Sequence, residues 1–469
     1  MKKVFANLIF LSLCLNSSFA QSLSTKNDAG GGEYPMQLNT AANPCITTEQ
    51  YAIIEKQCAE NIKTLHLDKP QYKTTSTLFN WPLRLVSGLN DCSYYFLANY
   101  VDQDNTSGIK DYNCGSVTYD GHRGNDIAIA PFPFYKMDNN QVEVIAAAPG
   151  TIINKVDGNF DKNCAMNSLT PNYIAIQHAD GSCALYLHMK ENSLTSKIVG
   201  QTVATGDFLG IVGSSGSSTA PHLHFEVWAT TASSSLNESY SGSCNLLNSN
   251  SWWVSQKPYT EPAVLHIGVD TALPVMPPCP GTETPNEDSC FHSGYSAKFV
   301  IYLRNETTGM TANMRIINPD GSTFASWVHN STSNYLGSYW YQTKTLPATK
   351  GTYTFEATYN STVCTRKFSI NCDSSITSGI LNTTKLSGIQ VVPNPANNII
   401  TVTGNNVANG VYKIAIQNII GQTLQSNMLT VENSTIQKTL SIADIPNGIY
   451  YLTVENNKSK TVQKIIKQN

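Results

Sequence analysis

The sequence predicts a mainly β chain that is divided into several all-β units. Charged residues make up only 13% of the chain, against a typical ~25%. Gly and Tyr are plentiful, with 30 and 23 residues, and this balance is common in extracellular β proteins. Residues 76–265 show short alternating apolar and polar runs broken by Gly turns, which is the pattern of antiparallel strands. At 469 residues, the chain is long enough for roughly three domains of ~150 residues.

The N-terminus has the pattern of a secretory signal peptide over residues 1–20. Two lysines precede an apolar run from Val4 to Leu15, and Ser18-Phe19-Ala20 supplies a small-x-small cleavage site before Gln21. Cys14 would suit a lipid anchor, but the bulky Leu13 before it disfavours one. No later run reaches the ~18 uncharged apolar residues of a membrane span. We therefore expect an exported, secreted chain with no stable membrane insertion.

Residues 21–75 contain one convincing helix, over 47–65. Thr47 can cap it with Gln50 closing a capping box, and apolar residues recur at helical spacing from Tyr51 to Leu65. We expect this N-terminal segment either to pack on the next domain or to act as a pro-segment that fills its groove.

The rest of the chain divides by composition. Residues 76–265 form the domain that carries the chemistry, and a Pro-rich linker follows over 266–290. Residues 291–373 predict a β-sandwich. Two roles are open for its aromatic residues Trp327, Trp340 and Tyr341, binding of glycan or protein and buried core, and buried core is preferred. A Ser/Thr/Asn-rich linker over 374–386 leads to a last all-β unit, 387–469.

The cysteines indicate an oxidising compartment. Of the 12 cysteines one, Cys14, lies in the signal peptide, and the remaining 11 contain no C-x-x-C pair, so disulfides are expected instead of a cysteine zinc site. Proximity in the sequence suggests four pairs, and we expect one thiol to be left over. These pairs are Cys45 with Cys58, Cys92 with Cys114, Cys164 with Cys183, and Cys364 with Cys372.

Two short strings, 121–126 and 221–226, supply the residue types of a catalytic zinc site. Pro221 favours extended backbone before it, so a strand begins at His222, and His222, His224 and Glu226 share one of its faces. His122 and Asp126 are separated by an even offset that places both side chains on one side of an extended segment. Two imidazoles and one carboxylate with an open fourth position are what hydrolytic zinc requires, and one histidine is left over.

A further base or oxyanion stabiliser should stand beside this set, and His188 is the candidate. In residues 184–189 we expect Leu185 and Leu187 on the core face, and Tyr186 and His188 on the other. Two roles are open for Tyr186, packing in the core and a hydrogen bond to the oxyanion, and packing is the preferred one.

Other polar residues have less specific settings. Glu226 is equally consistent with a hydrogen-bond acceptor behind a zinc histidine and with a solvated strand carboxylate. We expect His178 to support a turn. The remaining histidines, for which surface or packing roles are expected, are His66, His266, His292 and His329.

Residues 120–228 resemble the lysostaphin-type (LytM-like) zinc metalloendopeptidases. The matching segments are 144–152, 173–181, 186–188, 199–203, 206–213 and 217–226, in order and spacing. The resemblance implies an antiparallel β fold with a narrow groove and one Zn²⁺ held by His122, Asp126 and His224. It also implies that His188 and His222 are catalytic. The insertion 131–141, whose aromatic residues can form a groove wall, departs from the short form of the family.

The final ~80 residues are similar to the C-terminal sorting domain of the type IX secretion system. The segments that carry the similarity are 391–402, 411–422, 440–452 and the basic end 458–467. This resemblance implies passage across an outer membrane and the type IX secretion machinery as a partner. An ordinary β-sandwich adhesion module is the competing interpretation.

The sequence therefore predicts a secreted zinc metalloendopeptidase that cleaves peptidoglycan cross-bridges or stem peptides by attack of zinc-activated water. The alternatives are the same chemistry on extracellular Gly-rich proteins, and a non-catalytic LytM-like cell-wall regulator. A net charge of −3 and a pI near 6.3 give no general attraction to nucleic acid.

Overall fold

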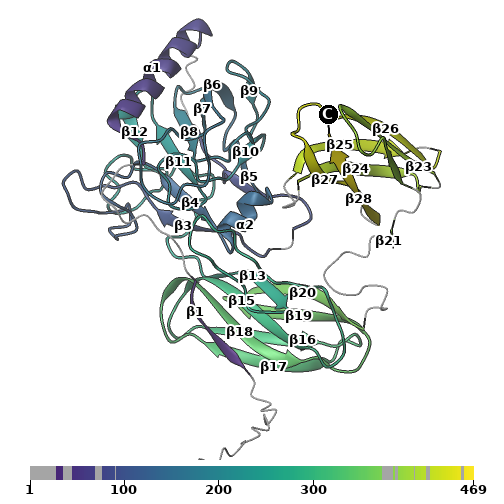
Figure 1. Cartoon of the computed structure of the whole chain (residues 1–469). Helices are drawn as coiled ribbons and strands as arrows, with labels where there is room; N and C mark the ends of the chain where they lie inside the picture. Colours follow the sequence, from purple (N-terminus) through teal and green to yellow (C-terminus); the bar gives the residue numbers. More distant parts are fainter. Residues whose placement is uncertain are drawn as a thin grey trace, which may run out of the picture. The chain divides into compact units, whose positions relative to one another are not determined.

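A computed structural model describes residues 28–34, 45–68, 76–89, 91–371, 384–385, 389–405, 407–418, 423–431, 433–455 and 459–468. The predicted signal peptide lies outside the described residues. The described residues fall into two compact units. The first comprises those within Met1–Ser289, Gly294–Pro347 and Thr352–Phe368, and the second those within Cys290–Ser293, Ala348–Gly351 and Ser369–Asn469. Both units are built mainly from antiparallel strands, which confirms the mainly β prediction (Figure 1).

The central sheet of the first unit carries the predicted site. Its strands follow the order β3 (Tyr95–Asn99), β4 (Asn125–Ile129), β11 (His222–Trp228), β8 (Cys183–Leu187), β7 (Tyr173–Gln177), β6 (Gly150–Val156) and β9 (Thr202–Val203), and β12 (Leu236–Asn237) pairs with β11. A three-stranded sheet of β10 (Phe208–Ile211), β5 (Val142–Ile145) and β2 (Leu83–Leu85) accompanies it. The short helices α2 (Pro133–Asp138) and η1 (Ser233–Ser235) lie in connections.

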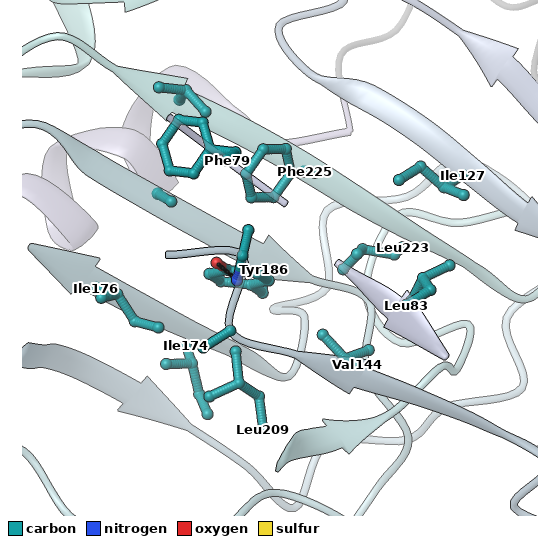
Figure 2. Packing of buried hydrophobic residues seen from close by; sticks show 14 of the residues in the cluster. Phe79, Leu83, Ile127, Val144, Ile174, Ile176, Tyr186, Leu209, Leu223 and Phe225 are labelled. Atoms are coloured by element: carbon teal, nitrogen blue, oxygen red, sulfur yellow. Dashed lines mark hydrogen bonds between the residues drawn. The ribbon is translucent and has the colours of Figure 1, made fainter. Parts of the chain in front are cut away.

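The core of this region is formed by one face of the central sheet. Leu223 and Phe225 of β11 and Tyr186 of β8 point into it, as Figure 2 shows. The alternation on β11 therefore follows the prediction. On β8 the predicted faces are reversed, because Tyr186 lies in this core while Leu185 and Leu187 pack on the opposite side of the sheet.

The predicted N-terminal helix is present as α1 (Thr48–Thr64), capped by Thr47 with Gln50 completing the capping box. Its buried residues, among them Tyr51, Ile54 and Ile62, pack against Leu185, Leu187 and Trp228. The helix thus covers the face of the central sheet that turns away from the main core, beside β6 and β7 (Figure 1). The same face carries His224 and Glu226.

A β-sandwich completes the first unit. One sheet has the order β1 (Ala29–Glu33), β18 (Tyr335–Thr345), β15 (Ser296–Glu306) and β13 (Ala263–Asp270). The other contains β20 (Thr362–Ile370), β19 (Gly351–Tyr359), β16 (Thr311–Ile317) and β17 (Thr323–Asn330) in that order. Residues 266–270, predicted as the start of the linker 266–290, are therefore part of a sandwich strand, because β13 pairs with β15.

The second unit includes the C-terminal β domain. It contains β14 (Cys290–Phe291), the sheet β21 (Thr384–Lys385), β28 (Ser459–Lys467), β27 (Gly448–Glu455), β24 (Gly410–Gln417) and β25 (Thr423–Val431), and the sheet β22 (Gln390–Val392), β23 (Ile399–Asn405) and β26 (Thr435–Ser441). Buried residues of both of these sheets form a separate core, with Ile414, Leu452 and Ile400 at its centre.

The disulfides differ from the pairs that sequence proximity suggested. Cys92 bonds Cys364, Cys114 bonds Cys244, and Cys164 bonds Cys279, across sequence separations of 272, 130 and 115 residues. Strand pairing brings distant segments together, so neighbours in the sequence are poor guides to neighbours in space. Three thiols are free among the described cysteines, not one: Cys45, Cys58 and Cys183.

His266 is a buried residue that packs on Tyr302, so of its two predicted roles, surface and packing, only packing agrees with the structure; the ionic contacts of its ring were not predicted. Its Nδ1 lies 2.5 Å from Asp91 Oδ1 and its Nε2 lies 2.5 Å from Glu287 Oε1. Lys136 and Arg366 complete the network by pairing with Asp91 and Glu287. Burial alone would lower the pKa of His266, but the two carboxylates raise it to about 9.

We predict that His266 makes the stability of the chain depend on pH in the alkaline range. Its folded pKa of about 9 exceeds the unfolded value of ~6.5. Its stabilisation is therefore complete below pH ~6.5 and is lost as the pH rises through about 9. Between these limits the wild type should lose up to about 3 kcal/mol more unfolding free energy than His266→Gln, measured by urea denaturation.

The comparison of the two chains cancels groups that titrate in this range and do not interact with His266. Burial raises the pKa of Asp270 to about 8 and His266 lowers it, so the comparison is made with both chains also carrying Asp270→Asn. Parallel pH profiles of the wild type and His266→Gln would contradict the prediction.

Candidate metal centre

The pairing of β4 with β11 brings the first two predicted ligands together. Asp126 lies directly opposite His224 in the antiparallel register, and Oδ1 of Asp126 is 2.9 Å from Nδ1 of His224. His122 precedes β4, and its Nε2 lies 3.2 Å from both of these atoms. Three potential ligand atoms, two imidazole nitrogens and one carboxylate oxygen, thus converge on one point.

The triangle of these atoms has the size that a tetrahedral metal requires. Zinc bonds to nitrogen and oxygen of ~2.0–2.1 Å correspond to about 3.3 Å between neighbouring ligand atoms. The observed separations are 2.9, 3.2 and 3.2 Å. The donor set therefore fits zinc, with room for one further ligand.

Each of the three side chains is oriented by a second hydrogen bond on its far side. Nδ1 of His122 donates to the backbone carbonyl of Tyr100 at 2.6 Å. Nε2 of His224 lies 3.2 Å from Glu226 Oε2, and Asn99 donates to Oδ2 of Asp126 at 3.0 Å. These partners leave Nε2 of His122, Nδ1 of His224 and Oδ1 of Asp126 directed at the shared point, as outer partners of metal ligands do.

The local electrostatics favour a cation at the shared point. Burial would raise the pKa of Asp126, but the imidazoles of His122 and His222 hold it well below its usual value, so the carboxylate is charged. Burial opposes a charge on His224, yet Cys45 and Asp126 raise the pKa of this imidazole well above its usual range. In the metal-free protein a proton therefore compensates the buried carboxylates, and metal binding has to displace it.

His188 reaches the site through an unusual backbone turn. It follows the end of β8, where Leu187 is the residue opposite His224, so a continued strand would direct His188 to the other face. Its φ of 65° lies in the left-handed region and breaks the alternation. The ring then lies 5.8 Å from that of His224 and 4.6 Å from that of His222, centroid to centroid.

The two predicted catalytic histidines are held in the same way. Nδ1 of His188 donates to the carbonyl of Ser215 at 2.7 Å, and Nδ1 of His222 to the carbonyl of Ala220 at 2.7 Å. Burial, followed by the neighbouring His222 and His224, lowers the pKa of His188 well below its usual value. Its Nε2 is buried without a hydrogen-bond partner in the described part of the chain. Nε2 of His222 lies 3.5 Å from Asp126 Oδ1.

Glu226 is a buried acceptor and not a solvated carboxylate. Besides His224 it accepts from the hydroxyl of Tyr51 at 2.6 Å and from Nε1 of Trp228 at 2.7 Å, and it pairs with Arg123 at 3.2 Å. Burial would raise the pKa of Glu226, but His224, Arg123 and Trp228 lower it. Tyr51 belongs to α1, so the N-terminal helix is hydrogen-bonded to the residue behind His224.

A cavity of about 420 Å³ opens beside this set of residues. Asp126, His222 and Cys45 line it, with the small residues 217–220 along one side. Pro133 and Phe134 of the predicted insertion line it as well, together with residues 276–279 of the Pro-rich segment. The Cys164–Cys279 disulfide ties this segment down.

The structure thus places all five predicted site residues within one cluster. Sequence reasoning missed three groups: Cys45, Asn99 and Gly124. Gly124 stands inside the quoted string 121–126, where a glycine next to a ligand is a usable signal. Cys45 and Asn99 carried no signal, because their approach depends on the packing of α1 and β3.

Gly124 leaves space for the ring of His224. A Cβ at this position would lie 2.5 Å from Nε2 and 2.7 Å from Cε1 of that ring. We predict that Gly124→Ala displaces the imidazole and weakens zinc binding by roughly 10–100-fold, the loss typical when the support of a ligand is removed. Metal titration followed by calorimetry measures this.

Gly448→Ala is the matched control, because its added Cβ meets only ordinary contacts with Tyr450 at 3.6 Å and beyond. Equal zinc affinity in Gly124→Ala and the control would refute the positioning role of Gly124.

Two family models match parts of this chain, and one of the matched ranges contains the five predicted site residues. Residues 121–237 match the model of peptidase family M23, and residues 390–468 match the secretion system C-terminal sorting domain. An uncharacterized metalloprotease of Buchnera aphidicola subsp. Baizongia pistaciae is 33% identical over 97 residues, which are 20% of this chain and 25% of that protein. The chain thus spans a quarter of the length of this curated relative.

Among solved structures, a catalytic-domain mutant of the prophage-encoded M23 protein EnpA from Enterococcus faecalis is 25% identical, with a TM-score of 0.19. The match covers 29% of this chain and 80% of that one. No helix among the described residues combines the length and hydrophobicity needed to cross a bilayer. The chain contains a peptidase family M23 (LytM-like) domain and, at its C-terminal end, a type IX secretion sorting domain.

Proposed function

We propose that the protein is a secreted zinc-dependent metalloendopeptidase that hydrolyses peptide bonds, with peptidoglycan cross-bridges or stem peptides as its substrate. The observation that carries the proposal is the convergence of His122, Asp126 and His224 at separations of 2.9–3.2 Å, with His188 and His222 beside them. The M23 match over residues 121–237 supports a metallopeptidase function.

In this proposal His122, Asp126 and His224 hold one Zn²⁺. A zinc ion bound there supplies a Lewis acid that polarises the scissile carbonyl and acidifies water. His188 is fully buried and its low pKa keeps it neutral, so its Nε2 can accept a proton and return it to the leaving amine. His222 presents Nε2 to the same space, because Nδ1 is engaged by Ala220.

The lining of the cavity favours a peptide of small residues. Residues 217–220 bring only Ser, Thr and Ala side chains beside His222. Phe134 and Tyr119 supply apolar surface, and Pro277 and Pro278 limit the space. Gly-rich extracellular proteins also consist largely of small residues, so they are the second substrate to test.

The sorting domain implies export and a secreted or cell-surface protein. We further propose that residues 1–20 are removed as a signal peptide and that the type IX machinery binds the region 387–469. An exported peptidase would encounter its peptide substrates outside the cytoplasm.

The test is a digest of purified peptidoglycan and of a Gly-rich protein with metal-replete chain, with and without chelator. Because the Cys45 sulfur contacts His224, wild type and Cys45→Ser are both assayed. Mass spectrometry identifies the bonds that are cut. We expect cleavage by at least one of the two chains, loss with chelator and recovery with zinc.

Variants separate metal binding from proton transfer. His224→Gln should lose zinc and activity together, whereas His188→Gln and His222→Gln should keep zinc and lose roughly 10²–10⁴-fold in kcat. His292→Gln, an exposed histidine outside the site, is the control. Folded, zinc-loaded chains that cleave neither substrate would refute the proposal and favour a non-catalytic LytM-like regulator.

A further inference from the structure

The thiol of Cys45 lies against the candidate metal centre. Its Sγ is 3.5 Å from Nδ1 and 3.9 Å from Nε2 of His224. Only 5% of the residue is exposed, and its side chain lines the same cavity as Asp126 and His222. Cys45 is a free cysteine, so its sulfur is available for another bond.

A second observation points to a ligand at the same place. Nε2 of His188 is buried and lacks a hydrogen-bond partner among the residues that the structure describes. Ligand atoms of Cys45, His188 and His224 all lie within 4.8 Å of one another. A buried thiol and a buried imidazole therefore both face the space next to the three predicted ligands.

The separation of sulfur from nitrogen suits two ligands of one metal. Zinc bonds of ~2.3 Å to sulfur and ~2.0–2.1 Å to nitrogen place the two atoms about 3.6 Å apart in a tetrahedron. The observed distance from Sγ to Nδ1 is 3.5 Å. Sγ is also 3.9 Å from Nε2, so it lies beside the ring. It groups with His188 and His224 and not with His122 and Asp126, so coordination requires the sulfur to move around the ring toward the point that the three predicted ligands share.

We propose that Cys45 is the fourth ligand of the bound metal and keeps the peptidase latent, an inference that rests on the proposed function. On coordination the S–H bond breaks, the proton leaves to solvent and a sulfur–metal bond forms. A thiolate in that position leaves no open site for the water that hydrolysis requires. The N-terminal segment is then an inhibitor joined to its own enzyme.

The fold holds Cys45 in place from both sides. Immediately after it, Ile46 and Tyr51 are buried in the cluster that docks α1 on the central sheet. Tyr51 also donates to Glu226, which supports His224. Earlier in the chain, β1 pairs with β18 of the sandwich and Tyr34 lines the cavity that contains Cys45. The contact between sulfur and imidazole is thus built by two docked elements of the segment.

Cobalt substitution tests the ligand directly in the full chain. A Co²⁺-loaded chain with a cysteine ligand shows an intense thiolate-to-cobalt charge-transfer band in the near ultraviolet. We expect this band in the wild type and in Cys58→Ser, and its loss in Cys45→Ser with cobalt still bound in a 1:1 ratio. Cys58 is the matched control, because it is a free, fully buried thiol of the same cluster.

The outcomes separate the two proposals. Cobalt bound at 1:1 without the band in the wild type would overturn the latency proposal and leave the metal site standing. Failure of the wild type to bind cobalt, with its circular dichroism spectrum unchanged, would overturn both. If the band persists in Cys45→Ser, the cobalt ligand is a different cysteine, and our inference is refuted.

Thiol chemistry and kinetics give an independent readout. Iodoacetamide should modify Cys45 at least ~10-fold faster after chelation of the metal, because a coordinated thiolate is protected. Peptidase activity of zinc-loaded Cys45→Ser should exceed that of the wild type by at least ~10-fold. Equal alkylation rates with and without metal, or equal activities of the two chains, would contradict latency through Cys45.

Discussion

The register between β4 and β11 is the constraint on which the site depends. Asp126 lies opposite His224 only in this pairing, and a slip by one residue would turn every side chain of a strand to the other face. The apolar residues Leu223 and Phe225 oppose that slip, because it would remove them from the main core and turn His224 and Glu226 into it. Burial of the core thus fixes the geometry of the polar face, although no polar interaction is needed to set it.

The N-terminal helix α1 excludes water from the face of the central sheet that carries His224 and Glu226. Glu226 is fully buried, and four donors from α1, β11 and the segment before β4 satisfy its carboxylate. Removal of any one donor leaves a buried charge less well compensated, which is costly. The helix is for this reason part of the hydrogen-bonding environment of His224, and not simply a cover over apolar surface.

Local patterns predicted the parts of the structure that are encoded locally. The capping box and the helical spacing of apolar residues predicted α1, and the alternation of apolar and polar residues after Pro221 predicted β11 with its two faces. The reversal of faces on β8 could not be foreseen, since it depends on the left-handed turn at His188, and a φ of 65° is rare for such a residue. The acceptor role of Glu226, the ionic role of His266 and the approach of Cys45 all arise from packing between segments far apart in the sequence.

The disulfide between Cys92 and Cys364 has a consequence for the biogenesis of the chain. The two cysteines are 272 residues apart, so a thiol at the beginning of the peptidase region waits for its partner until the sandwich has been synthesised and delivered. Cys114 and Cys164 find their partners earlier, after 130 and 115 residues. The outermost of the three bonds can therefore close only when both regions of the first unit are present.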